Sequence, residues 1–111
     1  MKLFCFIVSI TLLTSCYYNS EEIILDRSIS YNKHAKKIID DKCNNCHSPN
    51  ASQLVHPPFL TTYNEVVSQG QRIQVRVLNQ GNMPPSNSTN GFLTKGQKDT
   101  LQTWIKNGFP E

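Results

Sequence analysis

The chain has 111 residues, a hydrophobic content of 38% and a formal net charge of +3. This length suffices for one domain, and the hydrophobic content is low for a core made of side chains alone, which favours a fold centred on a large apolar cofactor. The charge is modest and mixed in sign, and the sequence has no basic run or recognition motif. We therefore predict no nucleic-acid partner.

Residues 1–15 have the features of a secretion signal. Lys2 precedes an apolar run over residues 3–13, which is shorter than the roughly 20 apolar residues of a membrane span. The run ends in a Leu-Thr-Ser-Cys sequence at Cys16 that resembles the lipobox of bacterial lipoprotein precursors. The resemblance implies cleavage before Cys16 and lipidation of this residue. The alternative is an ordinary secretory signal that is cut nearby, and both interpretations place the mature chain outside the cytoplasm.

Residues 16–29 are interpreted as a lipid-anchored tether. The segment lacks a clean helical or strand period and carries several polar residues. Attachment through several acyl chains holds a protein firmly at a membrane, here facing the periplasm or the cell surface. In the alternative, the apolar residues 23–25 pack on the domain that follows.

A first helix is predicted over residues 31–42, with Ser30 as its N-cap. Its apolar residues follow the i, i+4, i+7, i+8 spacing of a single helix face: Tyr31, Ala35, Ile38 and Ile39. Because the helix runs directly into residue 43, it fixes the orientation of the segment that begins there.

That segment, residues 43–47, reads Cys-Asn-Asn-Cys-His. Cys-x-x-Cys followed at once by His is typical of covalent c-type haem attachment. The Cys43 and Cys46 thiols form thioether bonds to the two porphyrin vinyl groups, and the imidazole of His47 ligates the iron as the proximal histidine. The sequence therefore predicts one covalent haem c per chain.

Three other chemistries use a Cys-x-x-Cys pair. A thioredoxin-like redox motif would require a strand and a βαβ pattern around it, and neither is visible. A structural zinc site would need His34 and His56 to complete its ligands. A plain disulfide between Cys43 and Cys46 is possible outside the cytoplasm, but it leaves His47 without a role.

Residues 48–61 are predicted to form a loop, because Pro49, Pro57 and Pro58 interrupt regular structure. His56 is interpreted as a loop histidine, with iron ligation as the alternative. A carbonyl of this loop, at Pro57 or Pro58, is expected to fix the tautomer of the His47 imidazole.

Two helices are predicted next. A capping box of Thr62 and Glu65 opens a short helix that Gly70 ends, and residues 71–80 form another helix that Gly81 ends. The inward-facing residues are expected to be Tyr63, Val66, Val67, Ile73, Val77 and Leu78.

Met83 is the candidate sixth ligand. It follows the predicted helix end and stands before Pro84 and Pro85, which stiffen the chain. A thioether suits haem iron, and His/Met ligation raises the reduction potential. The alternative role, that of a core-filling methionine, fits poorly beside two prolines.

After Pro85, a loop is predicted over residues 86–92, followed by a last helix. A second capping box, Thr94 with Gln97, opens this helix, and Gly108 ends it. Leu101, Trp104 and Ile105 form its buried face, with Trp104 as a packing anchor against the first helix and the haem rather than a redox relay.

These features together resemble the small bacterial class I cytochromes c. The resemblance covers residues 29–109 and is carried by the Cys-x-x-Cys-His segment, by Met-Pro-Pro at residues 83–85 and by Leu-x-x-Trp-Ile-x-x-Gly at residues 101–108. It implies an all-α cytochrome c-like domain over residues 30–111, with about four short helices around one covalent haem. It also implies crossing of the first and last helices, and His47 and Met83 as axial ligands. The glycine-rich loop common in longer members is absent after His47.

The resemblance implies a one-electron carrier rather than an enzyme, because an iron with both axial positions filled has none for a substrate. Redox partner proteins and a membrane, reached through the lipid anchor, are the expected partners. Five lysines are interpreted either as groups that steer an acidic partner or as an ordinary solvated face: Lys33, Lys36, Lys37, Lys95 and Lys98. The alternative function is a haem-based sensor of small ligands or a peroxidase-like module with a displaceable sixth ligand. A third possibility is a subunit of a larger respiratory or sugar-oxidising complex.

Overall fold

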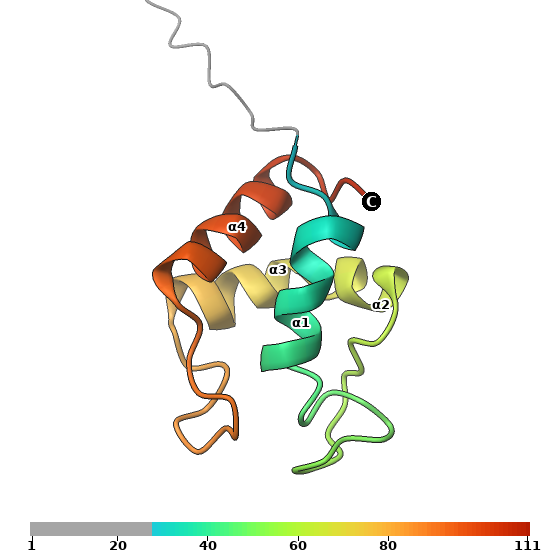
Figure 1. Ribbon diagram of the computed structural model, residues 1–111, viewed down its shortest axis with the longest axis vertical. Helices are drawn as coiled ribbons and strands as arrows, with labels where there is room; N and C mark the ends of the chain where they lie inside the picture. Colours follow the sequence, from blue (N-terminus) through green and yellow to red (C-terminus); the bar gives the residue numbers. More distant parts are fainter. Residues whose placement is uncertain (1–27) are drawn as a thin grey trace, which may run out of the picture.

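The computed structural model describes residues 28–111 (Figure 1). The predicted signal peptide, the lipid attachment at Cys16 and the tether up to residue 27 lie outside the described residues. Regular structure in the described part consists of helices without strands, which confirms the all-α prediction for this part. No helix within residues 28–111 has both the length and the apolar character needed to span a membrane.

The first helix has the predicted limits. It starts as a π-helical turn, η1 (Tyr31–Ala35), in which the amide of Ala35 donates to the carbonyl of Ser30 at 3.2 Å, and it continues as α1 (Lys36–Lys42). The side chain of Ser30 accepts from the amide of Lys33, as an N-cap residue does. The preceding Ile29 already packs against the core, so the folded part starts one residue earlier than predicted.

The middle of the chain forms three short helical segments: α2 (Tyr63–Ser68), α3 (Gly70–Ile73) and η2 (Gln74–Asn79). The capping box of Thr62 and Glu65 opens α2 as predicted. The predicted role of Gly70 is wrong, because Gln69 caps α2 and Gly70 is the first residue of α3. A Cβ on Gly70 would lie 2.3 Å from Cζ of Phe109, so glycine is needed here for close packing.

The last helix, α4 (Lys95–Lys106), begins with the predicted capping box of Thr94 and Gln97. Beyond its end, Gly108 has a φ of +80° and Phe109 a φ of +61°. The left-handed region costs a non-glycine residue free energy, and Phe109 is held there by its surroundings. Its amide donates to the carbonyl of Trp104, its carbonyl accepts from the Tyr63 hydroxyl at 2.7 Å, and its ring meets the Trp104 ring edge to face.

The two ends of the described chain meet at the top of Figure 1. The ring centroids of Tyr31 and Trp104 are 5.7 Å apart, and the amide of Tyr31 donates to the carbonyl of Pro110 at 2.8 Å. The first helix therefore packs on the last one, and the final residues satisfy amides that the start of a helix leaves free. Trp104 is fully buried, which confirms its prediction as a packing anchor against the first helix.

The core lies where the helices meet. Its buried apolar residues are Tyr31, Ala35, Ile38, Ile39, Leu60, Val66, Ile73, Val77, Leu93, Leu101 and Trp104. Of the other residues predicted to face inward, Tyr63, Val67, Leu78 and Ile105 are partly buried and pack against this core.

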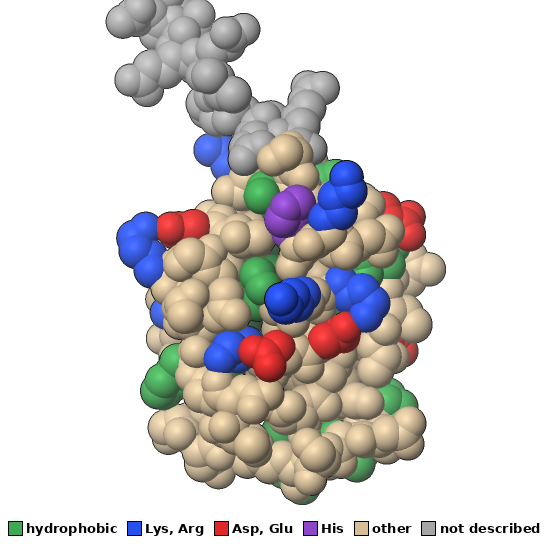
Figure 2. Space-filling view, in the orientation of Figure 1, with side chains coloured by type: hydrophobic (Ala, Val, Ile, Leu, Met, Phe, Trp, Pro, Cys, Tyr) green, Lys and Arg blue, Asp and Glu red, His purple; other side chains and the backbone are tan. Residues whose placement is uncertain are grey.

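Two loops extend from the other end of the helices. The first loop (residues 43–62) joins α1 to α2, and the second loop (residues 80–94) joins η2 to α4; both lie at the lower end in Figure 1. In Figure 2, basic side chains are spread among acidic ones over the helices, while the surface over the loops carries few charges. Lys36 with Asp40 and Lys95 with Asp99 form ion pairs one helical turn apart, so part of the predicted lysine face is paired with acidic groups.

Candidate cofactor site

The Cys-x-x-Cys-His segment forms a turn at the end of α1. The carbonyl of Cys43 accepts from the amides of Cys46 and His47, at 3.1 and 2.9 Å. Both cysteines are free thiols in the structure. The turn is tied to the rest of the first loop, since the carbonyl of His47 accepts from the amide of Leu60 at 2.8 Å. Backbone contacts thus fix the two thiols and the imidazole in one compact unit.

His47 is oriented by a carbonyl group of the first loop. Its Nδ1 lies 2.8 Å from the carbonyl oxygen of Pro58, which is one of the two carbonyls predicted for this role. A carbonyl oxygen only accepts hydrogen bonds, so Nδ1 carries the proton and donates it. The lone pair therefore stays on Nε2, which is the form of imidazole that binds a metal.

His56 belongs to the same region of the first loop. Its amide donates to the carbonyl of Cys46 at 2.7 Å, and its ring centroid lies 5.9 Å from that of His47 in an edge-to-face arrangement. The side chain is exposed, as predicted for a loop histidine, although it also contributes to the wall of the cavity described below.

Met83 lies in the second loop, and its backbone is bound by a residue of η2. The carbonyl of Arg76 accepts from the amides of Asn82 and Met83 at 3.0 and 3.2 Å, and Nε of Arg76 donates to Oδ1 of Asn82 at 2.9 Å. Gly81, with a φ of +65°, turns the chain between η2 and this contact, which agrees with its prediction as a helix-ending glycine. Arg76 thus fixes the position of the Met83 backbone.

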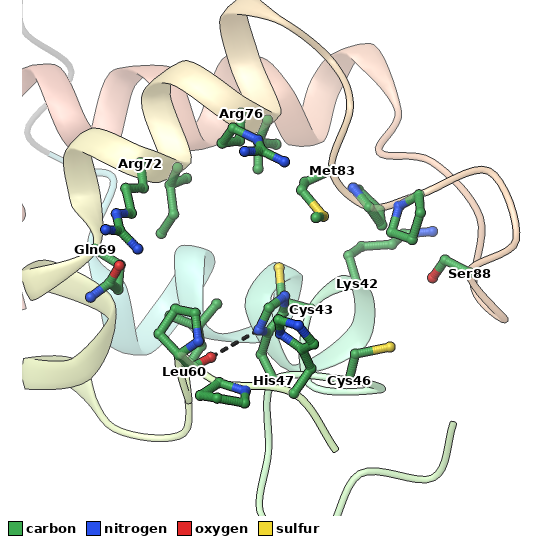
Figure 3. A pocket seen from close by; sticks show the side chains of 17 residues that line it. Lys42, Cys43, Cys46, His47, Leu60, Gln69, Arg72, Arg76, Met83 and Ser88 are labelled. Carbon is green, nitrogen blue, oxygen red and sulfur yellow. Dashed lines mark hydrogen bonds between the residues drawn. The ribbon is translucent and has the colours of Figure 1, made fainter. Parts of the chain in front are cut away.

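These two loops enclose a cavity of about 290 Å³ together with the α3–η2 segment. This is close to the lower limit of roughly 300 Å³ that is usual for small-molecule pockets. Cys43, Cys46, His47 and Met83 all line it, and Figure 3 shows Met83 on the opposite wall from His47. The apolar part of the wall comes mainly from prolines of both loops and from Leu60, Ile73 and Val77. The structure thus brings together the four cofactor-binding residues that were predicted from the sequence within residues 28–111.

Five polar residues of the wall were not predicted from the sequence: Lys42, Gln69, Arg72, Arg76 and Ser88. Three of them belong to the α3–η2 segment and the residue before it: Gln69, Arg72 and Arg76. They precede or flank Ile73 and Val77, which were assigned to the core. The i, i+3, i+4, i+7, i+8 spacing from Gln69 would have placed these three residues, Ile73 and Val77 on one helix face. Attention to the apolar positions alone concealed the polar ones.

The environment of Cys43 bears on its reactivity. Burial raises the pKa of its thiol to about 12, and the negative charge of Asp40 acts in the same direction. Reactive cysteines of redox motifs have lowered pKa values that favour the thiolate. A thiol with a raised pKa does not suit a thioredoxin-like redox motif.

The alternatives for the Cys-x-x-Cys pair gain no support from the described residues. Residues 28–111 contain no strand and hence no βαβ unit around the motif. In the same part of the chain, no group of three or more His, Cys, Asp and Glu side chains is placed to hold a metal ion. The two thiols are not joined in a disulfide.

The residues present fit a covalently attached haem. Two thiols, an imidazole with a free Nε2 and a thioether are the protein groups that c-type haems use, and a largely apolar cavity suits a porphyrin. Comparisons with protein-family models, with curated protein sequences and with solved structures found no match to this chain.

Proposed function

We propose that this chain is a one-electron carrier with one covalently bound haem c. The observation that carries the proposal is the meeting of Cys43, Cys46, His47 and Met83 around one cavity. Met83 stands 36 residues after His47 in the sequence, and the fold brings both residues to this cavity.

Each of these residues has a distinct task under this proposal. Cys43 and Cys46 attach the group covalently, and His47 presents Nε2 because the Pro58 carbonyl holds Nδ1. Met83 supplies a soft sulfur ligand from the opposite wall. When bound, a haem supplies reversible one-electron chemistry, whose potential axial ligands move over a range of about 0.8 V. With His47 and Met83 both holding the iron, the protein would transfer electrons rather than transform a substrate.

The cellular place of this carrier is part of the proposal. A lipid anchor at Cys16 and a tether up to residue 28 hold the haem domain outside the cytoplasm at a membrane surface. This rests on the resemblance of residues 1–16 to a lipoprotein signal. Redox partner proteins then meet the domain through small, transient contacts, as is usual for electron transfer.

The first experiment expresses the full chain together with a haem-attachment system. We expect a mass increase of one haem per chain that survives denaturation, and the absorption spectrum of a low-spin haem. A variant with both Cys43→Ala and Cys46→Ala is the control and should be colourless. A wild-type protein free of bound porphyrin would refute the proposal.

Met83→Ala separates an electron carrier from a sensor or peroxidase-like module. Wild-type protein should ignore carbon monoxide, because both axial positions are filled. Met83→Ala should retain the haem, bind carbon monoxide and have a lower reduction potential, since loss of the thioether removes the ligand that raises it. His56→Ala is the control and should not gain carbon monoxide binding, because it leaves Met83 in place. Ready binding of carbon monoxide by the wild type would favour the sensor.

A further inference from the structure

One end of the cavity has a different chemistry from the rest. Gln69, Arg72 and Arg76 lie there along one face of the α3–η2 segment and the residue before it. Figure 3 shows Gln69 and Arg72 at the end of the cavity remote from Cys46, and Arg76 between Arg72 and Met83. The cysteines thus occupy one end, and a polar, cationic group of residues occupies another.

The polar groups of these three side chains are only partly paired in the described part of the chain. Oε1 of Gln69 is buried without a hydrogen-bond partner in the described part of the chain, and buried amide groups are almost always paired. Among residues 28–111, the ion pairs involve neither Arg72 nor Arg76. No aspartate or glutamate lines the cavity. Two cations one helical turn apart repel each other, so an anion between them would stabilise the arrangement.

Guanidinium groups are the side chains best suited to hold carboxylates, because their donors match carboxylate geometry. Arg76 uses only Nε, toward Asn82, in its side-chain hydrogen bond, which leaves its terminal nitrogens free. Rotation of the Gln69 amide by half a turn exchanges its oxygen for its nitrogen, so it can donate to an anion as well. The group has the character of a carboxylate site.

A porphyrin held through its two vinyl groups has its two propionate carboxylates on the opposite edge. We propose that Gln69, Arg72 and Arg76 bind these propionates and thereby fix the orientation of the haem in the cavity. This inference rests on the proposed function, since it gives a role to the end of the haem cavity that is remote from Cys46. The cationic pair also favours the reduced, less positively charged state of the iron.

Arg72 is the residue to test, because Arg76 also holds the backbone of Met83. Arg72→Gln and Arg72→Lys are made in the haem-loaded full chain, with Lys106→Gln as the control for loss of one positive charge away from the cavity. The measurements are the reduction potential and the resonance Raman bands of propionate bending.

Arg72→Gln should lower the reduction potential and shift the propionate bands, because a cation that contacts the carboxylates is removed. Arg72→Lys keeps the charge and should keep the potential closer to the wild-type value while still shifting the bands. Lys106→Gln should change neither quantity. Wild-type propionate bands in Arg72→Gln would overturn the inference, whatever the potential does.

If Arg72→Gln yields no haem-loaded protein, Gln69→Leu serves in its place. The bands should then shift without loss of a charge, and unchanged bands would again overturn the inference. A wild-type chain that leaves the haem-attachment system without haem is a different result, which refutes the proposed function itself.

Discussion

The helices and the two loops of this molecule are stabilised in different ways. At the helical end, the rings of Tyr31 and Phe109 pack against that of Trp104. The carbonyls of Pro110 and Glu111 accept from the first amides of η1. The loops contribute only Leu60 and Leu93 to the buried apolar core. Several other residues of the loops line the cavity, and residues such as Leu54 and Val55 are more than half exposed.

Hydrogen bonds of Gln53 join the two loops to each other. The side chain of Gln53 donates to the carbonyl of Asn87 at 2.9 Å and accepts from the amide and hydroxyl of Thr89 at 3.0 and 2.8 Å. The amide of Gln53 also donates to the carbonyl of Asn45, between the two cysteines. Gln53 therefore links the segment that carries His47 to the loop that carries Met83.

The difference indicates where a cofactor contributes to stability. Direct hydrophobic contact, the dominant favourable term in folding, is concentrated between the helices. The loops give few side chains to this core, and several of their apolar residues line the cavity instead. We infer that the helical end is stabilised by the chain itself, whereas the loops depend on what fills the cavity.

Gly70→Ala should have the largest effect on the helical end. The new Cβ would lie 2.3 Å from Cζ and 2.5 Å from Cε1 of Phe109, and the Phe109 ring cannot move away without disturbing its edge-to-face contact with Trp104. Overpacking of this kind costs about 1–3 kcal/mol in the free energy of unfolding. Urea unfolding of the variant measures it.

Gly96→Ala is the matched control. A Cβ there would meet only Oγ1 of Thr94, at 4.0 Å, so the variant should gain about 0.5–1 kcal/mol from helix propensity. Phe109→Gly removes the ring and accepts a positive φ without strain. Combined with it, Gly70→Ala should lose most of its cost, because the two residues interact directly. Equal costs in both backgrounds would contradict the packing argument.

The role of Gly70 also shows where prediction from sequence stopped. Helix limits set by local chemistry were predicted well, as the caps at Ser30, Thr62 and Thr94 demonstrate, because the capping groups lie within three residues of their partners. Gly70 was assigned to a helix end because its partner, Phe109, is 39 residues away and invisible to local rules.

The residues of the candidate site also fall into those that the sequence predicted and those that only the fold shows. The residues of the 43–47 motif could be nominated because their spacing is itself the chemical signal, and Met83 because of its unusual neighbours. The sequence left two candidates for the carbonyl that orients His47, those of Pro57 and Pro58. The folded backbone shows that it is the carbonyl of Pro58. Arg72 could not be found from its type, since an arginine on a short helix is usually a solvated side chain.

Gln53→Ala tests the dependence of the loops on polar links. Removal of its three side-chain hydrogen bonds, which are exposed, should lower the free energy of unfolding by about 1 kcal/mol. The local effect should be larger than the global one, because few apolar contacts hold the loops together. Faster hydrogen exchange at the Thr89 amide, which donates to Gln53, would show that the loops separate.

The matched control is Gln102→Ala in α4. Gln102 and Gln74 exchange two side-chain hydrogen bonds, at 3.1 and 3.2 Å, between α4 and η2. These helices are also joined by buried side chains such as Val77 and Leu101. Amide exchange in α4 and η2 should therefore stay as in the wild type. Equal local loosening in both variants would abolish the distinction between the two ends of the molecule.

The smallest expected effect concerns the two capping boxes, which have the same geometry but different chemistry. In the first, hydrogen bonds from the side chain of Thr61 and from the amides of Thr62 and Thr61 lower the pKa of the Glu65 carboxyl. In the second, Oε1 of Gln97 accepts from the amide of Thr94 at 2.9 Å, and this group does not titrate.

A carboxyl whose pKa is lower in the folded state stabilises the fold above its unfolded pKa of about 4.3. This contribution disappears as the pH falls through the lower, folded value. Glu65→Gln should therefore be less stable than the wild type at pH 7, and the difference should shrink at pH 3. Gln97→Ala should lose the same free energy at both pH values, because nothing in its box changes charge. Urea unfolding at the two pH values measures both variants, and a Glu65→Gln deficit that persists at pH 3 would mean that the carboxylate charge does not matter for this cap.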